Sequence, residues 1–328
     1  MKRSLTIAFW NVHNLFREGQ HPKRGPKSKE EREAKLDALA AVIGRLGNGM
    51  PPDLLALAEV SEESLIRDLL RRLPLTLKDP PTVVFESPQS QETGVAIAAL
   101  TPVVAQLSRM GADDENGNRP HALSVRVTLA APGTIPLYVV ACHWKSDLHG
   151  TGALTSSKNR RESGKWLKKH LETHGGPNGL ADPIVVVGDF NAEPFAPEIS
   201  GDRALHATRH LSKSKRANKV RLFNTMWDWL VDPGVPAKPN VPVRHAPRSV
   251  TSWGRSEPKV LDQLMVSRSI LLKEAFTLDR VDYHRDDDTA ELLPQLLTWV
   301  PRPWTWDPKG RYGKGTSDHF PLVASLLY

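Results

Sequence analysis

The chain has 328 residues, of which 39% are hydrophobic and 25% are charged. These fractions exclude a disordered, collagen-like or coiled-coil chain, and no apolar run approaches the ~20 residues that a membrane-spanning helix needs. The net charge of +7 favours an anionic partner such as nucleic acid or another phosphate ester, while the single cysteine, Cys142, cannot form an intramolecular disulfide and favours a cytoplasmic location.

Short apolar runs rich in β-branched residues predict buried strands along the whole chain. They cover residues 5–9, 54–57, 95–99, 123–129, 137–141, 184–187, 264–266 and 322–327. Helical spacing of apolar residues predicts helices over 30–46, with Ala34 on the apolar face, and over 61–73 and 159–174. Strands alternate with helices early and then cluster, which favours a two-sheet α/β body over a doubly wound sheet.

Four segments are expected to be long loops, at residues 17–29, 202–219, 233–247 and 282–312. The polar motifs described below lie on both sides of every one of them. We therefore expect a single domain spanning residues 1–328.

Two strands in the first part of the chain each end close to a polar oxygen-bearing side chain. Asn11 follows the run at 5–9, and Glu59 follows the run at 54–57. Hard divalent cations prefer oxygen ligands, usually one or two carboxylates together with water and substrate phosphate. Glu59 with Asn11 nearby fits a magnesium site, although a glutamate at a strand end is also commonly just solvated.

The run at 137–141 leads to His143, and Lys145 lies two residues further on. Placed on the same face, the two side chains can donate to phosphate oxygens in a cleft. The alternative is a histidine at the edge of the core beside a lysine whose stem covers apolar surface. Cys142 is better explained as a small buried hydrophobic residue than as a nucleophile.

The segment Gly188-Asp189-Phe190-Asn191 follows a buried strand directly. At the carboxyl end of a strand, residues two apart can point into the same cleft. Asp189 can hold a metal or orient a water molecule, and Asn191 can donate to a developing oxyanion without adding charge. Gly, Asp and Asn are also the usual residues of a turn at a strand end, so the motif has two interpretations.

Asp262 lies inside an otherwise apolar strand within residues 260–267, where a carboxylate is costly unless it is paired. A histidine is a natural partner, because a carboxylate fixes its tautomer and basicity. We predict a pair between Asp262 and His319, which follows Asp318 just before the last strand. Asp318 is a possible metal ligand and His319 a possible general base. The alternative is that Asp262 accepts hydrogen bonds from the backbone at the strand edge.

In this order, Asn11, Glu59, His143, the Gly188–Asn191 motif, Asp262 and the Ser317-Asp318-His319 motif resemble the endonuclease/exonuclease/phosphatase superfamily, with its deoxyribonuclease I-like fold. The resemblance extends from Asn11 to His319. It implies a four-layer α/β/β/α sandwich of two packed mixed β-sheets flanked by helices, with the site at their shared edge.

The resemblance also implies roles for these residues. It implies that Glu59 binds Mg²⁺, or Mn²⁺ in its place, with Asn11 and Asp318 close by. Asp189 corresponds to the residue that orients or deprotonates the attacking water, and Asn191 to one that contacts the phosphate. The Asp262–His319 pair would polarise the site, and His143 is similar to a second histidine of the deoxyribonuclease-like members. Glu92 is a candidate for the acid that often accompanies that histidine.

Three functions are compatible with this set. A nuclease is favoured by the net charge, by the basic stretches 158–161, 165–169 and 213–219, and by the Trp-rich loop 297–312, although each stretch can equally be ordinary surface. A phosphoesterase acting on a small molecule or lipid is the alternative; inositol phosphatases, however, usually carry Trp and Arg where Val187 and Ala192 stand. A non-catalytic relative would lack a catalytic position, and none is lost.

We therefore predict an Mg²⁺-dependent phosphodiesterase, a nuclease that hydrolyses DNA rather than RNA by in-line attack of an activated water. The expected catalytic residues are His143, Asp189, Asn191, Asp262 and His319, the expected metal-site residues are Asn11, Glu59 and Asp318, and Lys145 is expected to bind substrate. No membrane span and no protein partner are implied.

Two histidine pairs at helical spacing, His170/His174 and His206/His210, lack a third zinc ligand, so a zinc site is not expected there.

Overall fold

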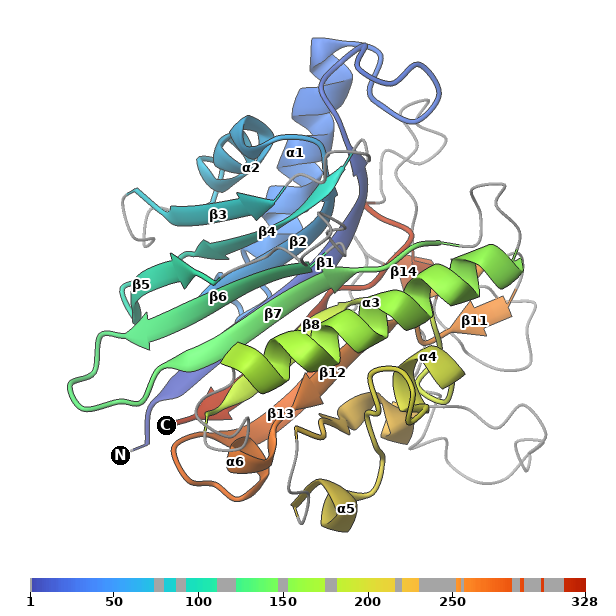
Figure 1. Ribbon diagram of the computed structural model, residues 1–328. Helices are drawn as coiled ribbons and strands as arrows, with labels where there is room; N and C mark the ends of the chain where they lie inside the picture. The colour runs from blue at the N-terminus through green and yellow to red at the C-terminus, as the bar shows by residue number, and fades with distance from the viewer. Residues whose placement is uncertain are drawn as a thin grey trace, which may run out of the picture.

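Two six-stranded β-sheets packed face to face form the centre of the molecule (Figure 1). The protein is described by a computed structural model covering residues 2–73, 80–86, 93–110, 122–146, 153–174, 182–215, 220–229, 252–254, 257–284, 290–291, 302–303 and 316–328. Both sheets are mixed, because each contains one parallel pair at its centre, β1 with β2 and β7 with β8.

The first sheet has the order β13-β16-β1-β2-β4-β3. In chain order its strands are β1 (Ser4–Leu15), β2 (Leu54–Val60), β3 (Thr82–Glu86), β4 (Gly94–Ala99), β13 (Thr277–Tyr283) and β16 (Leu322–Leu327). The second sheet has the order β5-β6-β7-β8-β12-β9. Its strands are β5 (Val104–Arg109), β6 (Ala122–Leu129), β7 (Leu137–His143), β8 (Ile184–Asp189), β9 (Phe223–Asn224) and β12 (Asp262–Val266).

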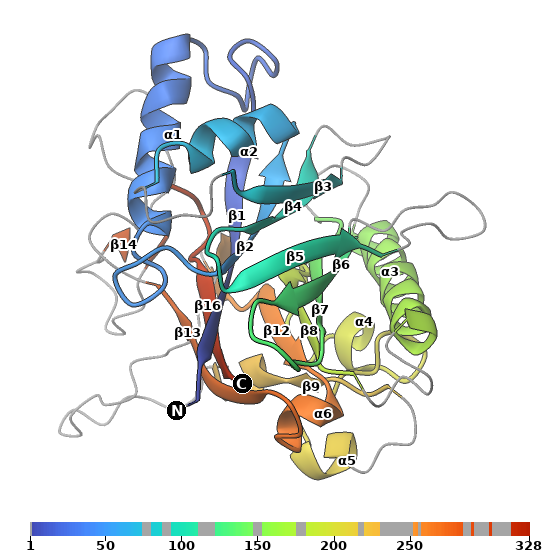
Figure 2. The same ribbon diagram turned by 90° about the vertical axis from the view of Figure 1, so that its left-hand side faces the viewer.

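Helices cover the outer face of each sheet, so the layers are helix, sheet, sheet and helix (Figure 2). Helices α1 (Lys29–Ile43) and α2 (Glu63–Leu70) pack on the first sheet, and α3 (Ala153–His174) packs on the second. The remaining short elements are α4 (Pro197–Ser200), α5 (Leu211–Lys215), η1 (Thr225–Trp229), α6 (Arg268–Leu271), and the hairpin strands β10 (Ser252–Gly254), β11 (Glu257–Lys259), β14 (Ala290–Glu291) and β15 (Arg302–Pro303). This arrangement confirms the expected four-layer sandwich.

The apolar runs of the sequence correspond to the interior strands of the two sheets. β1, β2, β4 and β16 in the first sheet, and β6, β7, β8 and β12 in the second, each contain one predicted run. Strands β2, β4, β8 and β12 are buried on both faces, which makes their runs continuously apolar. In contrast, β16 alternates buried and half-buried residues, and β6 includes the exposed Arg126. The edge strands β3, β5, β9 and β13 were not predicted, because they are more exposed and contain polar residues.

The segments expected to be loops have mixed outcomes. Residues 17–29 form turns before α1, and 202–215 include the short helix α5. The segment 233–247 lies outside the described residues, and so does most of 282–312. No helix among the described residues is long and apolar enough to cross a membrane.

Strand pairing brings polar ends of both sheets to one edge. β1 and β2 are parallel, as are β7 and β8, so the carboxyl ends of each pair lie together. β12 runs antiparallel to β8 with Asp262 opposite Asp189. β16 runs antiparallel to β1 with Leu322 opposite Phe9, which places residues 317–320 beside the end of β1. All predicted site residues therefore lie at the same end of the sandwich.

Gly188 permits the close approach of β8 to β7. A Cβ atom at this position would overlap the carbonyl oxygen of Cys142 and lie 2.7 Å from its backbone nitrogen. Both contacts are with the backbone of a buried strand, which cannot move aside without breaking the sheet.

We expect Gly188→Ala to destabilise the protein by more than about 2 kcal/mol, because the added methyl group overpacks the sheet. Gly133→Ala is the control: its Cβ meets nothing within 4 Å, so only the left-handed backbone costs energy, about 1 kcal/mol. Urea unfolding followed by tryptophan fluorescence measures both. Equal losses for the two variants would contradict the close approach.

Candidate active site

Polar contacts across the seam between the two sheets form the centre of the site. Asn11 and Glu59 come from the first sheet, and His143, Asp189 and Asp262 from the second. His319 lies just before β16 of the first sheet. The structure therefore brings together the residues that the sequence predicted from strands far apart in the chain.

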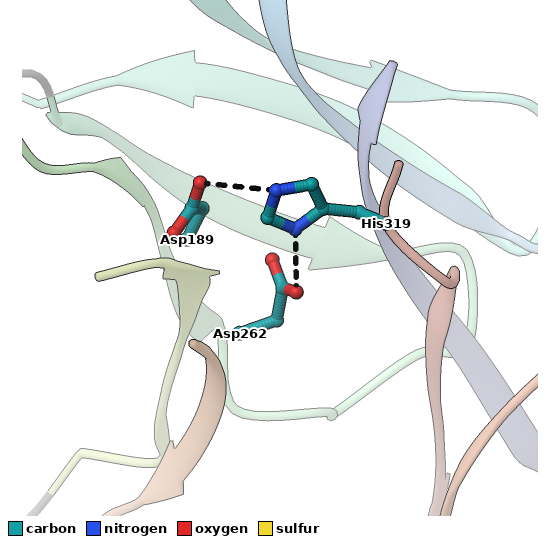
Figure 3. Close-up of side chains that lie close together, drawn as sticks. All are labelled: Asp189, Asp262 and His319. Carbon is teal, nitrogen blue, oxygen red and sulfur yellow. Dashed lines mark hydrogen bonds and ion pairs between the residues drawn. The ribbon is translucent and has the colours of Figure 1, made fainter. Parts of the chain in front are cut away.

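The predicted Asp262–His319 pair is present (Figure 3). His319 Nδ1 lies 2.8 Å from Asp262 Oδ2, a hydrogen bond between two buried side chains. On the other side of the ring, His319 Nε2 lies 3.7 Å from Asp189 Oδ2. The imidazole is thus held between two carboxylates of the second sheet, with Asp262 fixing its orientation.

The backbone around His319 is also anchored to the end of β1. The indole nitrogen of Trp10 donates to the His319 carbonyl oxygen at 2.8 Å. The Ser317 hydroxyl donates to the Asn11 carbonyl oxygen at 2.6 Å and accepts from the His319 N–H at 3.2 Å. The Ser317-Asp318-His319 motif therefore contributes a backbone anchor as well as the imidazole.

The surroundings of His319 favour its protonated form. Burial opposes the charge, but the carboxylates of Asp262 and Asp189 outweigh that effect and raise the pKa of His319 well above 6.5. In the protein without metal, His319 at neutral pH is consequently an imidazolium. It can donate a proton or a hydrogen bond rather than accept one.

Glu59 is held in a fixed orientation at the end of β2. Its Oε1 accepts from Asn11 Nδ2 at 2.9 Å and lies 3.6 Å from His143 Nε2, and its Oε2 accepts from the Asn14 N–H at 2.8 Å. Burial raises the pKa of Glu59. The neighbouring His143 and His13 and the hydrogen bond from Asn11 outweigh this effect and lower the pKa to about 2. Glu59 is therefore a carboxylate at any physiological pH.

Asp189 Oδ2 is the point where these contacts converge. It accepts from Asn11 Nδ2 at 3.0 Å and from Asn191 Nδ2 at 3.2 Å, and it lies 3.9 Å from His143 Nε2. Its Oδ1 accepts from the Asn191 N–H at 2.8 Å. The chain turns sharply after Asp189 to make these contacts, with Asn191 in the left-handed region at φ 47°.

Asn191 thereby has a more local role than expected. Its side-chain nitrogen has two hydrogens, and they are used by Asp189 Oδ2 and by the Trp144 carbonyl oxygen at 2.9 Å. In this structure Asn191 orients Asp189 and the segment after β7. A direct contact with phosphate stays a prediction.

The structure adds two residues that the sequence analysis missed. His13 lies in the turn after Asn11, and its Nε2 is 3.9 Å from Asp318 Oδ2. Lys35 of α1 is buried and donates to the carbonyl oxygens of His13 and Asn14. Burial lowers the pKa of Lys35 to about 8, against the attraction of Glu59 and Asp318, so it is mainly charged at neutral pH.

Lys35 supports the left-handed turn behind Glu59. His13 and Asn14 have φ of 50° and 59°, and this conformation directs the Asn14 N–H to Glu59. Lys35 binds the carbonyl oxygens of the same two residues. The sequence signal for Lys35 was its position one turn before Leu39, on the apolar face of the helix. The sequence pattern had instead assigned Ala34 to that face, and the structure shows Ala34 exposed.

The remaining predicted residues lie outside this cluster of contacts. Lys145 follows the buried Trp144 after the end of β7. Its side chain is half-buried and makes no hydrogen bond or ion pair among the described residues. Its role in substrate binding stays a prediction.

The histidine pairs and the cysteine have ordinary structural surroundings. His206 pairs with Asp202 and Arg221, whereas His210 is exposed. His170 stacks on Trp166. Burial raises the pKa of the Cys142 thiol. Glu92 is outside the described residues.

The charge of the site fits a divalent cation. Four carboxylates lie in the cluster, and protonated Lys35 and His319 leave an excess of negative charge. Among the described residues, Asp189, Asp262 and His319 offer ligand atoms within 4.8 Å of one another, but Asp262 and His319 already bind each other. Glu59 and Asp318 carry the oxygen ligands that Mg²⁺ prefers, and their role as metal ligands stays a prediction.

Comparisons with known proteins show the family of the chain and the fold that it shares with solved structures. A family model described as the endonuclease/exonuclease/phosphatase family matches residues 6–327. A search of curated proteins found no match. Among solved structures, human Nocturnin's catalytic domain with a bound sulfate anion has a TM-score of 0.55 and 16% identity, over 99% of this chain and 97% of that one.

Two further solved structures show similar likeness. D. rerio TDP2 complexed with a single-strand DNA product has a TM-score of 0.54 and 12% identity, over 98% of both chains. A mannosyl-6-phosphatase of Bacteroides thetaiotaomicron has a TM-score of 0.55 and 15% identity, over 99% of this chain and 100% of that chain. At such identities the likeness shows a shared fold.

The environment of His319 generates a prediction about its protonation. In metal-free protein with chelator, NMR of the imidazole nitrogens should show His319 protonated at pH 7. Because its pKa is raised on folding, the resulting stabilisation is complete below pH 6.5 and is lost as the pH rises through the raised value. Asp262→Asn should lower the pKa of His319 strongly, and Asp318→Asn only weakly. Identical titration in both variants would contradict the pairing.

Proposed function

The chain belongs to the endonuclease/exonuclease/phosphatase family, and from that premise we propose that this phosphoesterase is an Mg²⁺-dependent nuclease that hydrolyses DNA. The convergence of contacts on Asp189 Oδ2 is the observation that supports the chemistry most directly. A carboxylate fixed by two amides and flanked by two histidines suits activation of a water molecule.

Hydrolysis of a phosphodiester has three requirements: an in-line nucleophile, neutralisation of the charge that develops on the phosphorane, and protonation or stabilisation of the leaving alkoxide. Asp189 orients the water and accepts its proton. His319, protonated and held by Asp262, donates to a phosphate oxygen or to the leaving oxygen. His143, 12% exposed at the rim of the same cluster, donates to a phosphate oxygen.

Glu59 and Asp318 would hold the magnesium ion, with Asn11 orienting Glu59 through a 2.9 Å hydrogen bond. When bound there, the ion supplies Lewis-acid stabilisation of negative charge on phosphate oxygens. Lys35 binds the carbonyl oxygen of His13 and so stabilises the turn whose backbone N–H, that of Asn14, donates to Glu59. Each of these residues orients an oxygen of the carboxylate cluster.

The choice of substrate rests on the surface around the site. D. rerio TDP2, a protein of similar fold, is solved with a single-strand DNA product, whereas another similar structure is a mannosyl-6-phosphatase. On this chain, α3 exposes the basic side chains of Lys158, Arg161, Lys165 and Lys169. Exposed cations along a helix suit a polyphosphate backbone, which a mannose phosphate does not have.

An aromatic surface beside the site also favours a substrate with bases. Phe195 is 57% exposed and lies four residues after Asn191, so its Cα is within about 14 Å of the Asn191 Cα. Its ring centroid is 6.5 Å from that of Trp227, and the Arg209 guanidinium lies 5.1 Å from the Trp227 ring centroid. An exposed phenylalanine ring beside a half-buried tryptophan and a cation suits the stacking of unpaired bases. The predicted Trp-rich loop 297–312 is almost entirely outside the described residues.

The first test is hydrolysis by purified protein of plasmid DNA, single-stranded DNA, RNA and a small diester, each with Mg²⁺, Mn²⁺ or chelator. We expect metal-dependent cleavage of DNA. Asp189→Ala and His319→Ala should lower kcat by roughly 10²–10⁴-fold, because each removes a proton-transfer group. Glu59→Ala should raise the Mg²⁺ concentration required for activity.

Glu274→Gln, which changes an exposed carboxylate between α6 and β13, is the control and should leave kcat and the metal requirement unchanged. Cleavage of the small diester alone would transfer the proposal to a small-molecule or lipid phosphate ester. Full activity in Asp189→Ala would refute the site assignment.

Phe195→Ala tests the aromatic surface separately. Loss of one base-stacking contact should raise KM for single-stranded oligonucleotides about tenfold, within the ~1–3 kcal/mol that such a contact contributes. Phe195→Trp should preserve KM, and so should Leu272→Ala, which removes an exposed apolar side chain elsewhere. Oligonucleotides with abasic positions flanking the cleaved bond should not distinguish Phe195→Ala from the wild-type protein. Equal losses on abasic and normal oligonucleotides would exclude stacking.

A further inference from the structure

Arg160 differs from the other basic residues of its stretch on α3. Lys158 and Arg161 are exposed, as a role on a nucleic-acid surface requires, but Arg160 is only 6% exposed. It lies on the buried face of the helix with Gly164, Leu167 and Leu171, at spacings of three and four residues. Its guanidinium therefore faces the protein interior.

The Arg160 guanidinium contacts two segments next to the site. Its Nη1 donates to the Lys145 carbonyl oxygen at 3.1 Å, and its Nη2 lies 3.4 Å from Glu198 Oε1. Lys145 belongs to the segment 144–146 after β7. Glu198, 4% exposed, belongs to α4, which follows the Asn191 turn after β8. Arg160 thus joins the two segments that follow the central strands of the second sheet.

The same segments contact the catalytic cluster directly. The Trp144 N–H donates to the Asp189 carbonyl oxygen at 2.8 Å, and the Trp144 carbonyl oxygen accepts from Asn191 Nδ2 at 2.9 Å. A second α3 residue, Ser156, donates to the Ser146 carbonyl oxygen at 3.2 Å. The segment 144–146 is consequently fixed from both sides, by the site at Trp144 and by α3 at Lys145 and Ser146.

Close packing places α3 against this segment. A Cβ on Gly164 would lie 2.9 Å from the Glu198 carbonyl oxygen and 3.3 Å from the Trp144 ring. Trp144 in turn packs edge-on against Phe190, with ring centroids 4.6 Å apart. The helix, the tryptophan and the Gly188–Asn191 motif form one packed unit, so a displacement of the segment would reach Asn191 and Asp189.

We propose that Arg160 is a positioning residue: from beneath the site, it holds the segments after β7 and β8 in the register that lets Asn191 and His143 orient around Asp189. Its contribution to turnover rests on the proposed function; its effect on the Asn191 turn does not. A guanidinium suits this place because its fork can serve two acceptors at once, whereas a lysine ammonium is a single point charge.

The proposal separates two effects that a basic residue can have on a nuclease. A residue that contacts the substrate backbone changes KM and its dependence on salt. A residue that orients catalytic groups changes kcat. Arg160 and its sequence neighbour Arg161 allow both to be measured one residue apart on the same helix.

The experiment compares four variants on a single-stranded oligonucleotide with Mg²⁺. Arg160→Met alone leaves the Glu198 carboxylate buried without its partner and can fail to fold. The double variant Arg160→Met/Glu198→Gln removes both charges and keeps similar volume, and Arg160→Lys keeps the positive charge. Arg161→Met is the matched surface variant. Thermal melting and hydrogen exchange of the Trp144 and Asn191 amides accompany the kinetics.

We expect kcat to fall at least tenfold in the double variant and less in Arg160→Lys, with KM within twofold of wild type in both. Exchange of the Trp144 and Asn191 amides should accelerate in the double variant and stay unchanged in Arg161→Met. Arg161→Met should raise KM and make KM less dependent on the salt concentration. If the Arg160 variants instead change KM and the salt dependence, or if the folded double variant keeps both kcat and amide protection, the proposal is overturned.

Amide exchange separates this proposal from the proposed function. If the wild-type protein cleaves no nucleic acid but the double variant loosens the Trp144 and Asn191 amides, the nuclease assignment fails and the positioning role stands. If the wild-type protein cleaves DNA and neither kcat nor amide exchange responds to the Arg160 variants, only the positioning role fails.

Discussion

Buried carboxylates at the seam between two sheets are the constraint on which this molecule depends. A buried carboxylate is stable only with a hydrogen-bonded or oppositely charged partner. Here the partners come from the opposite sheet: Asn11 binds Asp189, His143 lies beside Glu59, and His319 binds Asp262. A shift of one sheet against the other would separate all three pairs at once. The geometry of the site and the register between the sheets are therefore maintained by the same contacts.

The fold was predictable from the sequence to the extent that burial produces a pattern. Interior strands such as β8, with its run of Ile and Val, are apolar on both faces and were found as continuous runs. An edge strand such as β13, which includes Asp279, Arg280 and Asp282, has no such run. Its assignment depends on pairing with β16, a partner that no local pattern specifies.

The site was predictable where its residues form local motifs. Asp189, Asn191 and His319 follow directly from short motifs at strand ends, and the partner of Asp262 could be inferred because a buried carboxylate needs one. Lys35 and Arg160 could not be found in that way, because each contacts backbone carbonyl oxygens of a segment distant in the sequence. Their signal was a cation at an apolar position of a helix. In Arg160 that signal was hidden inside a run of basic residues interpreted as surface.

The left-handed backbone at the site has a consequence for the sequence that the protein can tolerate. His13, Asn14, Glu59 and Asn191 have φ between 47° and 63°, a conformation that costs a non-glycine residue roughly 1 kcal/mol or more. Glycine would relieve the backbone strain at each position, but at Glu59 and Asn191 it would also remove side chains whose hydrogen bonds hold the cluster together. The strain is therefore retained because the side chains of these residues contribute contacts that glycine cannot make, and the four positions mark where backbone strain and the polar cluster are in conflict.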